Sequence, residues 1–253
     1  VEMVGQRRRR AQAGLLTVVS GPVSRKRNPS HEAIRPMKLN ADLSLPVHVD
    51  TNALEWAASP SPGVDRRMLD RDGDEIARAT SVVRYAPGSE FPTHTHGGGE
   101  EFLVLDGVFS DEHGDFPAGT YVRNPVGSSH APRTGPGCTI LVKLRQMDPA
   151  DQTQVTVDTN GGDWVEGDVP GLFRMPLHEF GTERVWLTKM GAGCAARPHD
   201  HPGGEEVFVL EGSVEDEAGL HPKGTWFRLP PGSSHSPRTE EGCLLWVKTG
   251  HLK

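Results

Sequence analysis

The sequence predicts an all-β protein built as two tandem barrels, and three observations support this prediction. The 253 residues include 30 glycines and 21 prolines, as many short strands joined by tight turns require. Apolar runs such as 102–105 are short and bounded by turn residues, which is typical of buried strands. The stretch 88–143 also recurs at 193–248 without a gap, with about half of the aligned residues identical. Each repeat is long enough to bury a core of its own.

The predicted strands alternate with glycine, proline and acidic turns. They are rich in apolar and β-branched residues and cover 79–85, 91–96, 102–105, 119–124, 184–190 and 243–248. A hairpin turn is expected at Asp106–Gly107, because Asp-Gly favours the tight turn between two strands. Residues 148–159 are polar and are expected to link the two barrels.

Each repeat carries three histidines and one glutamate in the same pattern. His94 and His96 lie two residues apart, so on a strand both imidazoles leave the same face. Imidazole and carboxylate suit Fe(II), Zn, Mn, Ni or Cu, and four protein ligands leave positions on a six-coordinate ion for water, substrate or dioxygen. One divalent metal per barrel is expected, held by His94, His96, Glu100 and His130 and by His199, His201, Glu205 and His235.

The spacing of these residues resembles the two motifs of the cupin superfamily. The first motif is matched by Gly88, His94, His96, Glu100 and Gly107, and the second by Gly119, Pro125, Gly127 and His130. Thr134 stands where many cupins have asparagine. The repeat matches again at Gly193, His199, His201, Glu205, Gly212, Gly224, Pro230, Gly232 and His235. The resemblance implies two cupin domains, which are double-stranded β-helix or jelly-roll barrels.

Two further runs narrow the resemblance. Gly-Gly-Glu-Glu at 98–101 and Ser-Ser-His-Ala-Pro-Arg-Thr at 128–134 have counterparts at 203–206 and 233–239. These runs resemble the ChrR-like cupins, and the resemblance covers residues 53–248. That subgroup includes the sensory domain of a zinc-binding anti-sigma factor and proteins described as dioxygenases of small oxygenated compounds.

Three functions are compatible with such metal sites. The first is a dioxygenase-type oxidoreductase acting on a small diketone or hydroxyketone, since two neighbouring metal positions stay open for substrate and dioxygen. A low aromatic content, with 8 Phe and 2 Tyr, fits a small polar substrate. The second is a metal-dependent hydrolase or isomerase. The third is a non-enzymatic metal or small-molecule sensor like the anti-sigma relative, although residues 1–52 contain no cysteine for that relative's zinc module.

The repeats differ beside the expected ligands. Thr93, Thr95 and Gly97 of the first repeat correspond to Pro198, Asp200 and Pro202 of the second. The prolines stiffen the second loop, and Asp200 adds negative charge that would repel an anionic substrate. The glycine loop 97–99 is freer to admit a ligand. The catalytic residues are therefore expected to be those of the first barrel, His94, His96, Glu100 and His130, with the second barrel structural or regulatory.

The first 36 residues differ from the rest of the chain. They hold eight arginine or lysine residues against two glutamates, in a chain whose net charge is −7. We expect residues 1–36 to form a disordered basic arm, with Met37 as an alternative start, or else a targeting or binding arm. The first barrel is expected over 37–150 and the second over 151–253.

Several partners are not expected. Basic and aromatic residues do not alternate as in nucleic-acid-binding segments, and no recognition motif is present. No apolar run approaches the ~20 residues that span a membrane. The expected partner is a small-molecule substrate, and a homodimer is left open.

The three cysteines are too few and too unevenly spaced for a domain built on disulfides. Cys138 and Cys243 are repeat partners beside apolar strands and are expected in the cores, whereas Cys194 stands alone near the second site. A reducing, cytoplasmic location is the expectation.

Three other charged residues recur in the repeat alignment. Glu101 alternates away from Glu100 on its strand, so it is expected to be solvated or to support the ligands, in preference to the alternative that it binds the metal itself. Arg123 and Arg228 lie in apolar strands, where a role in the pocket and an edge salt bridge are equally compatible with the sequence.

Overall fold

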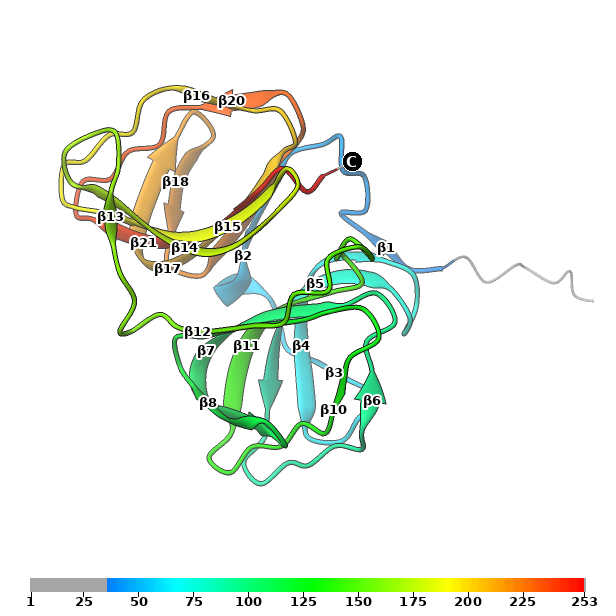
Figure 1. The fold of residues 1–253 in the computed structure, drawn as a ribbon. Helices are drawn as coiled ribbons and strands as arrows, with labels where there is room; N and C mark the ends of the chain where they lie inside the picture. Colours follow the sequence, from blue (N-terminus) through cyan, green and yellow to red (C-terminus); the bar gives the residue numbers. More distant parts are fainter. Residues whose placement is uncertain (1–35, 253) are drawn as a thin grey trace, which may run out of the picture. The chain divides into compact units, whose positions relative to one another are not determined.

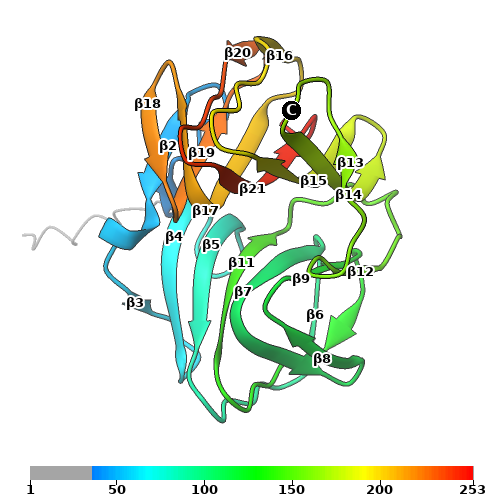
Figure 2. The ribbon, with the colours of Figure 1, turned by 90° about the vertical axis from the view of Figure 1, so that its left-hand side faces the viewer.

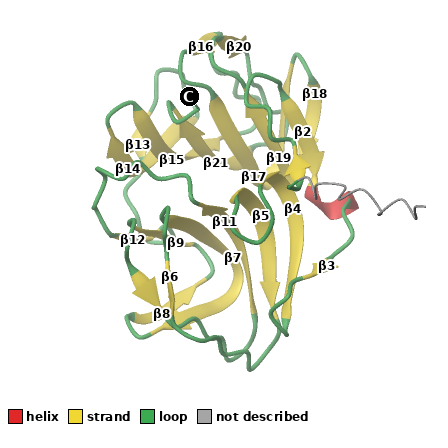
Figure 3. Cartoon of the chain, turned by 90° about the vertical axis from the view of Figure 1, so that its right-hand side faces the viewer, coloured by secondary structure: helices red, strands yellow, loops and turns green. Residues whose placement is uncertain are grey.

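The computed structural model describes residues 36–252, and strands make up most of this part of the chain (Figures 1 and 3). The helical segment among these residues is one 3-10 turn, η1 (Thr51–Ala53). The expectation for residues 1–36 falls outside the described part except for Pro36. Within that part, no helix has the length and apolar character needed to cross a membrane.

The first barrel is formed by one large sheet and a short two-stranded one. The large sheet has the order β1 (Lys38–Leu39), β4 (Val64–Asp72), β5 (Arg78–Tyr85), β11 (Cys138–Leu144), β7 (Glu100–Asp111), β9 (Thr120–Asn124) and β12 (Val155–Asp158). Two short strands pair with it, β3 (Ala57–Ala58) on β4 and β8 (Gly114–Pro117) on β7. The two-stranded sheet consists of β6 (His94–Thr95) and β10 (Ser129–His130).

The second barrel repeats this arrangement. Its large sheet has the order β13 (Val165–Glu166), β14 (Leu172–Phe180), β15 (Glu183–Met190), β21 (Cys243–Thr249), β17 (Glu205–Asp216), β19 (Thr225–Leu229) and β2 (Val47–Asp50). β18 (Gly219–Pro222) pairs with β17, and β16 (His199–His201) pairs with β20 (Ser233–His235). The all-β class and the internal duplication are thus confirmed.

The barrels exchange their edge strands. β2 precedes the first barrel in sequence but pairs with β19 of the second, with Val47 opposite Arg228 (Figure 2). β12 lies in the stretch 148–159 but pairs with β9 of the first barrel, with Val155 opposite Arg123. The structure therefore differs from a simple division at residue 150. β2, which precedes the first barrel, completes the edge of the second sheet, and β12, which precedes the second barrel, completes the edge of the first.

The predicted hairpin turn at Asp106–Gly107 is wrong, because β7 continues through both residues. Gly107 has a φ of 73° and pairs with Cys138, next to a register shift in the ladder with β11. A Cβ at Gly107 would lie 2.0 Å from the carbonyl oxygen of Gly137. The glycine therefore permits a bulge that bends a long strand around the barrel, in place of a turn that ends it.

Three apolar cores stabilise this unit. One fills each barrel, around Phe102 and Phe109 in the first and around Val207 and Phe227 in the second. The third lies between the barrels and combines residues of both, including Leu69, Leu103, Tyr121 and Leu141 with Leu187, Phe208, Trp226 and Trp246. All three cysteines are buried and unpaired, which confirms the prediction for Cys138 and Cys243 and places Cys194 in the core of the second barrel as well. The shared core joins the two barrels by hydrophobic burial.

A buried network of charges accompanies the shared core. Its carboxylates are Asp70, Glu101, Asp151, Glu183 and Glu206, and its basic groups are Arg78, Arg123, Lys143, Arg228 and Lys248. Lys143 of the first barrel binds Glu206 of the second, and Lys248 of the second binds Glu101 of the first at 2.5 Å. Each barrel thus supplies one lysine and one glutamate to a reciprocal pair, and the charges balance.

This network gives Glu101 a role that differs from the expected one, and it confirms salt bridges for the two arginines, although these are buried between the barrels and do not lie at an edge. Glu101 is 2% exposed and its carboxylate contacts Arg123 and Lys248, so it is not solvated, and it binds none of the metal ligands although it follows Glu100 in β7. Arg123 is fully buried and binds Asp151 at 2.8 Å, and Arg228 binds Asp70. The side chains serve the contact between the barrels, because a buried charge needs an opposite charge at hydrogen-bond distance.

We expect the folded unit to lose stability as the pH falls from 4.5 to about 2. Burial alone would raise the pKa of Glu101, but the charges of Lys248 and Arg123 outweigh it and lower the pKa to about 2. A carboxyl whose folded pKa is depressed stabilises the fold above its unfolded pKa, and this contribution, on the order of 3 kcal/mol, disappears as acid protonates it. Denaturant unfolding followed across this pH range measures the loss.

The control for this effect is Glu101→Gln, which cannot titrate. Its stability should be lower at neutral pH and should change less between pH 4.5 and 2 than that of the wild type. Equal pH dependence in the two proteins would show that Glu101 does not carry the effect.

Candidate metal centres

The first candidate centre lies where β6, β7 and β10 meet. His94 is in β6, Glu100 begins β7, and His130 ends β10 directly opposite His94 in the ladder. One ligand atom from each of His94, His96, Glu100 and His130 lies within 4.8 Å of those of the other three. His94 is exposed and the other three are buried, so the cluster has one open side.

The second centre repeats this geometry in β16, β17 and β20. His199 lies opposite His235 in the ladder, and Glu205 begins β17. The ligand atoms of His199, His201, Glu205 and His235 again lie within 4.8 Å of one another, with His199 exposed. The structure therefore brings together, in two groups of four, all eight residues that the sequence singles out. Each group could hold one metal ion.

The polar atoms inside each cluster fit a cation. His96 Nε2 and His130 Nε2 each lie 3.4 Å from Glu100 Oε2, and neither ring nitrogen has a hydrogen-bond partner although both are buried. His201 Nε2 and Glu205 Oε2 are likewise without partners. Ligands about 2.1 Å from a shared ion lie about 3.0–3.4 Å apart at octahedral or tetrahedral angles. A divalent cation would satisfy these atoms, which otherwise carry the cost of unpaired buried groups.

The opposite nitrogen of several rings is held by an acceptor. His130 Nδ1 lies 3.1 Å from Asp111 Oδ2, and His235 Nδ1 lies 3.1 Å from Asp216 Oδ2. A carboxylate accepts, so Nδ1 carries the proton and Nε2 presents its lone pair to the centre of the cluster. The same holds for His96, with Ser128 Oγ at 3.0 Å, and for His199, with the Arg197 carbonyl at 2.8 Å.

The second barrel extends this support. Asp216 Oδ1 also accepts from His221 Nε2 at 2.9 Å, and the His221 ring stacks on His48 of β2 with centroids 5.0 Å apart. At the position of His221, the first barrel has Phe116, which offers Asp111 no such bond. The second barrel alone thus has a row of polar side chains from the ligand His235 through Asp216 and His221 to His48, and His48 lies on the exchanged strand β2.

Asp111 and Asp216 are not predicted from the sequence to be parts of the sites. Each is the last residue of its strand, β7 or β17. The available signal is the alignment of the repeats, in which both aspartates are retained at the same place. Their function depends on a contact across 19 residues of sequence, and only the fold brings the partners together.

Burial favours the neutral forms of two ligands in the second centre. It raises the pKa of Glu205 to about 7 and lowers the pKa of His201 to about 4. A divalent cation would pair with the ionised Glu205 carboxylate and displace its proton, whereas His201 is already neutral at physiological pH. The cluster is therefore electrostatically incomplete without a cation.

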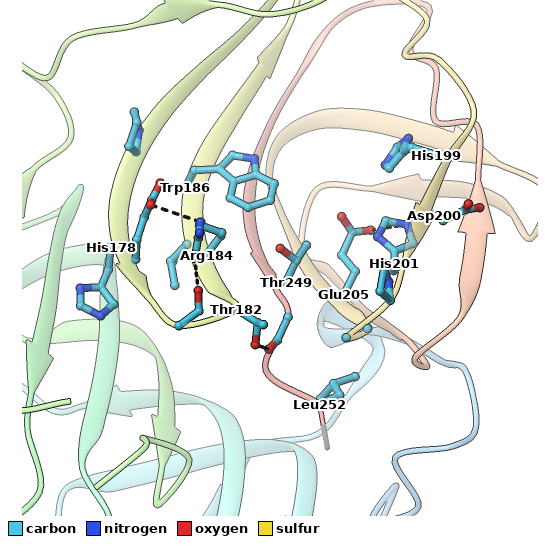
Figure 4. A pocket seen from close by; sticks show the side chains of 18 of the residues that line it. His178, Thr182, Arg184, Trp186, His199, Asp200, His201, Glu205, Thr249 and Leu252 are labelled. Atoms are coloured by element: carbon cyan, nitrogen blue, oxygen red, sulfur yellow. Dashed lines mark hydrogen bonds and ion pairs between the residues drawn. The ribbon is translucent and has the colours of Figure 1, made fainter. Parts of the chain in front are cut away.

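A cavity of about 880 Å³ opens onto the second centre (Figure 4). Its walls include Arg174, Trp186, His199, His201, Glu205 and Gly250. A smaller cavity of about 50 Å³ continues inward and shares Arg174, Trp186, His199 and Glu205 while reaching His235. The exposed side of this centre thus faces a space in which a small molecule fits beside the ligands.

The interior of the first barrel is more filled by aromatic rings. At the positions of Met190, Ala196, Val207 and Val214, which line the inner cavity, it has Tyr85, Phe91, Phe102 and Phe109. The Phe102 and Phe109 rings lie 4.7 Å apart, and the Phe109 ring lies 5.7 Å from that of His130. At two other positions the larger residue is in the second barrel, which has Trp186 and Phe227 where the first has Ser81 and Val122. The aromatic cluster occupies volume beside the first centre.

The glycine loop of the first barrel is closely packed. A Cβ at Gly98 would lie 2.7 Å from Arg145 Cα, and one at Gly99 would lie 2.1 Å from Met147 Sδ. At the place of Arg145 the second barrel has Gly250, which lines the large cavity. The freedom expected of this loop is therefore limited by Arg145 and Met147. The second loop is packed as closely, since a Cβ at Gly203 would lie 2.6 Å from Gly250 Cα and one at Gly204 would lie 2.4 Å from Leu252 Cδ1. The barrels differ in the side chain of Arg145, which reaches Gly97 and has no counterpart at Gly250.

The chain has recognisable relatives. The family model of the ChrR cupin-like domain matches residues 45–148 and again residues 152–253. None of the curated proteins compared with the chain matches it significantly.

Solved structures with a similar fold include a proposed dioxygenase of Nostoc punctiforme, with a TM-score of 0.68, 19% identity and coverage of 81% of this chain and 82% of that one. The protein YlbA of Escherichia coli has a TM-score of 0.63 and 14% identity, covering 87% and 96%. An oxalate decarboxylase of Lactobacillus farciminis, in complex with formate, has a TM-score of 0.59 and 12% identity, covering 81% and 86%. Because the family match extends over both barrels, the chain belongs to the ChrR cupin-like family and carries two of its domains in tandem.

Proposed function

We propose that the chain is a metal-dependent oxidoreductase of the dioxygenase type that acts on a small oxygenated compound. The residues that would hold the metal ions are the two groups of three histidines and one glutamate, one group per barrel. A divalent metal bound there supplies Lewis acidity and, as Fe(II), redox chemistry toward dioxygen.

The lining of the inner cavity carries this proposal. Among the described residues that line it, the ionisable ones are Arg174 and the ligands His199, Glu205 and His235. The remainder is mostly apolar, with Leu172, Met190, Val207, Leu245 and Val247 among its members. Apart from the ligands, the described residues of this inner wall offer no carboxylate or imidazole that could act as a general base for hydrolysis or isomerisation. An apolar wall of this kind suits the entry of dioxygen and the exclusion of water.

The side chains around the second centre would position a substrate. Trp186 lines both cavities and offers a flat apolar surface next to the exposed imidazole of His199. Asp216 fixes the His235 ring through its Nδ1, so this ligand cannot rotate away when a substrate binds. The buried Glu205 supplies the one negative charge of the ligand set.

These features favour chemistry in the second barrel. The large and the small cavity both adjoin its ligands, while Tyr85, Phe109 and Arg145 occupy equivalent space in the first barrel. This runs against the expectation from the loop residues, which places catalysis at His94, His96, Glu100 and His130. The two assignments predict opposite effects on turnover when the ligands of only one barrel are replaced.

The fold comparison adds limited support. The protein of Nostoc punctiforme named above is described only as a proposed dioxygenase, and the oxalate decarboxylase acts on a small oxygenated molecule. At 19% and 12% identity, both likenesses concern the fold. A small-molecule substrate of this kind agrees with the size of the cavities.

Dioxygen consumption tests the proposal. Protein reconstituted with Fe(II) is expected to consume dioxygen in the presence of a panel of small diketones, hydroxyketones and 2-oxo acids, and protein loaded with Zn should not. Hydrolysis or isomerisation supported by both metals would favour the second function. Neither activity with any divalent metal would favour a sensor.

A further inference from the structure

The hairpin that joins β4 to β5 in the first barrel is longer than its counterpart in the second barrel, which joins β14 to β15. In the first barrel, Asp72 pairs with Arg78, and five residues join the two strands. In the second, Phe180 pairs with Glu183, and only Gly181 and Thr182 lie between them. The second hairpin is thus three residues shorter, and both of its turn residues line the large cavity.

The longer hairpin carries a carboxylate that pairs with an arginine. Arg66 Nη1 lies 3.2 Å from Glu75 Oε2, and Arg66 Nη2 lies 3.4 Å from Glu75 Oε1. Two guanidinium nitrogens therefore face the two oxygens of one carboxylate, which is the geometry that arginine prefers. Glu75 belongs to the segment that the second barrel lacks.

Arg174 is the counterpart of Arg66 in the second barrel and lacks such a partner. Among residues 36–252, no carboxylate forms an ion pair with it. Its guanidinium carbon lies 5.8 Å from the centre of the Trp186 ring, and its charge acts on Glu205 and His199 without a hydrogen bond to either. The nearby Glu179 is paired with Arg184 at 3.2 Å. Arg174 lines both the large and the small cavity, in company with the ligands His199 and Glu205.

The charges at this end of the cavity favour an anion. A divalent ion held by three neutral histidines and the Glu205 carboxylate keeps one net positive charge, and Arg174 adds a second. Asp200 also lines the cavity, but it alternates with His199 and His201 on β16. In Figure 4 its carboxylate lies on the side of His201 remote from Trp186 and Thr249. The repulsion that Asp200 exerts on an anion is therefore weaker than the attraction exerted by Arg174 and by the bound cation.

We propose that the second barrel binds a small ionised carboxylic acid with a neighbouring oxo or hydroxyl group, and that Arg174 holds the carboxylate. Glu75 in the first barrel occupies the place that this substrate carboxylate takes in the second. The oxygenated carbon next to it then points toward the ligands His199 and Glu205. This inference rests on the proposed function in that it assigns the substrate class of the same cavity.

Pyruvate and its neutral amide, pyruvamide, test the assignment, because they have the same size and differ in having a carboxylate or a carboxamide group. Binding is measured by calorimetry on the full chain loaded with Zn, so that no turnover is needed. Wild type should bind pyruvate more tightly than pyruvamide. Arg174→Gln should weaken the binding of pyruvate about tenfold to a hundredfold, the value of a lost charge-assisted pair, and leave the binding of pyruvamide unchanged.

Arg66→Gln in the first barrel is the matched control and should leave both affinities as in wild type. Equal affinity of wild type for the two probes, or an Arg174→Gln variant that keeps the preference for pyruvate, would overturn the assignment. Arg174 is exposed, so its replacement does not threaten the fold, and circular dichroism verifies this. A preserved pyruvate preference in a protein that consumes no dioxygen would count against the proposed function alone.

Discussion

Replacement of Glu206 by alanine is expected to destabilise the folded unit by about 3–5 kcal/mol, because it leaves a buried lysine without its counter-charge. Glu206 is fully buried and binds Lys143 across the contact between the barrels. Burial lowers the pKa of Lys143, and the charge of Glu206 opposes this effect. Without Glu206 the ammonium must either stay charged in an apolar surrounding or lose its proton. Denaturant unfolding at neutral pH measures the change in free energy.

Glu215→Ala provides the matched control. Glu215 pairs with Arg238 at 2.7 Å, but both side chains are largely exposed, and such surface pairs contribute at most about 1 kcal/mol. The double variant Lys143→Met with Glu206→Leu should recover most of the stability lost in Glu206→Ala, since it removes both charges. Equal effects of Glu206→Ala and Glu215→Ala would show that the buried pair does not join the barrels.

The second large effect concerns turnover. His201→Ala is expected to reduce the rate more than about a hundredfold, whereas His96→Ala should leave most of it, because substrate enters the cavity of the second barrel. The two variants remove equivalent buried ligands, so they serve as controls for one another. Metal content is determined in each preparation, so that loss of one ion can be separated from loss of both.

The reverse pattern would restore the assignment that follows from the loop residues alone. In that case His96→Ala would abolish turnover, and the open glycine loop 97–99 would outweigh the packing of Arg145 and Met147 against it. Equal loss in both variants would mean that the two centres act together.

The fold and the ligand clusters follow from the sequence because their determinants are local and occur twice. His94 and His96 lie on one short segment, and Glu100 begins the next strand, so the spacing alone brings them close. The second copy at a constant offset of 105 residues excludes coincidence for His130 as well as for the others. Alternation along strands then decides which side chains face the interior.

The exchanged strands and the buried charges could not be derived in this way. β2 and β12 are short, and their pairing with the other barrel depends on the relative position of two finished sheets. Arg123 and Arg228 occur in apolar strands, where a pocket and a contact between barrels leave the same pattern in the sequence.

The cavity was only partly foreseeable. The offset between the repeats changes from 108 residues at Arg66 and Arg174 to 105 at the first ligands, which marks a deletion of three residues. That the deletion removes the partner of Arg174 is known only from the contact between Arg66, in β4, and Glu75, in the turn that follows β4. The alignment of the repeats shows that four aromatic residues of the first barrel are replaced by smaller ones in the second. It does not show that the four positions line one cavity.

Metal binding to the native fold should also raise its stability. If the ions bind only the folded barrels, free metal at a thousandfold excess over the dissociation constant is expected to raise the unfolding free energy by about 4 kcal/mol per site. Melting curves before and after chelation measure this difference. Identical curves would mean that the clusters hold metal weakly.

Metal content per chain tests the assignment of the two centres most directly. Protein purified without a metal-chelating tag, reconstituted with Fe(II) or Zn and freed of unbound ions, should contain about two ions per chain. The variants His96→Ala/Glu100→Ala and His201→Ala/Glu205→Ala each keep only two ligands of one cluster, so each should contain about one ion, and the variant with all four changes almost none. A wild type that retains no ion, or variants of one cluster with unchanged content, would contradict the assignment of these eight residues.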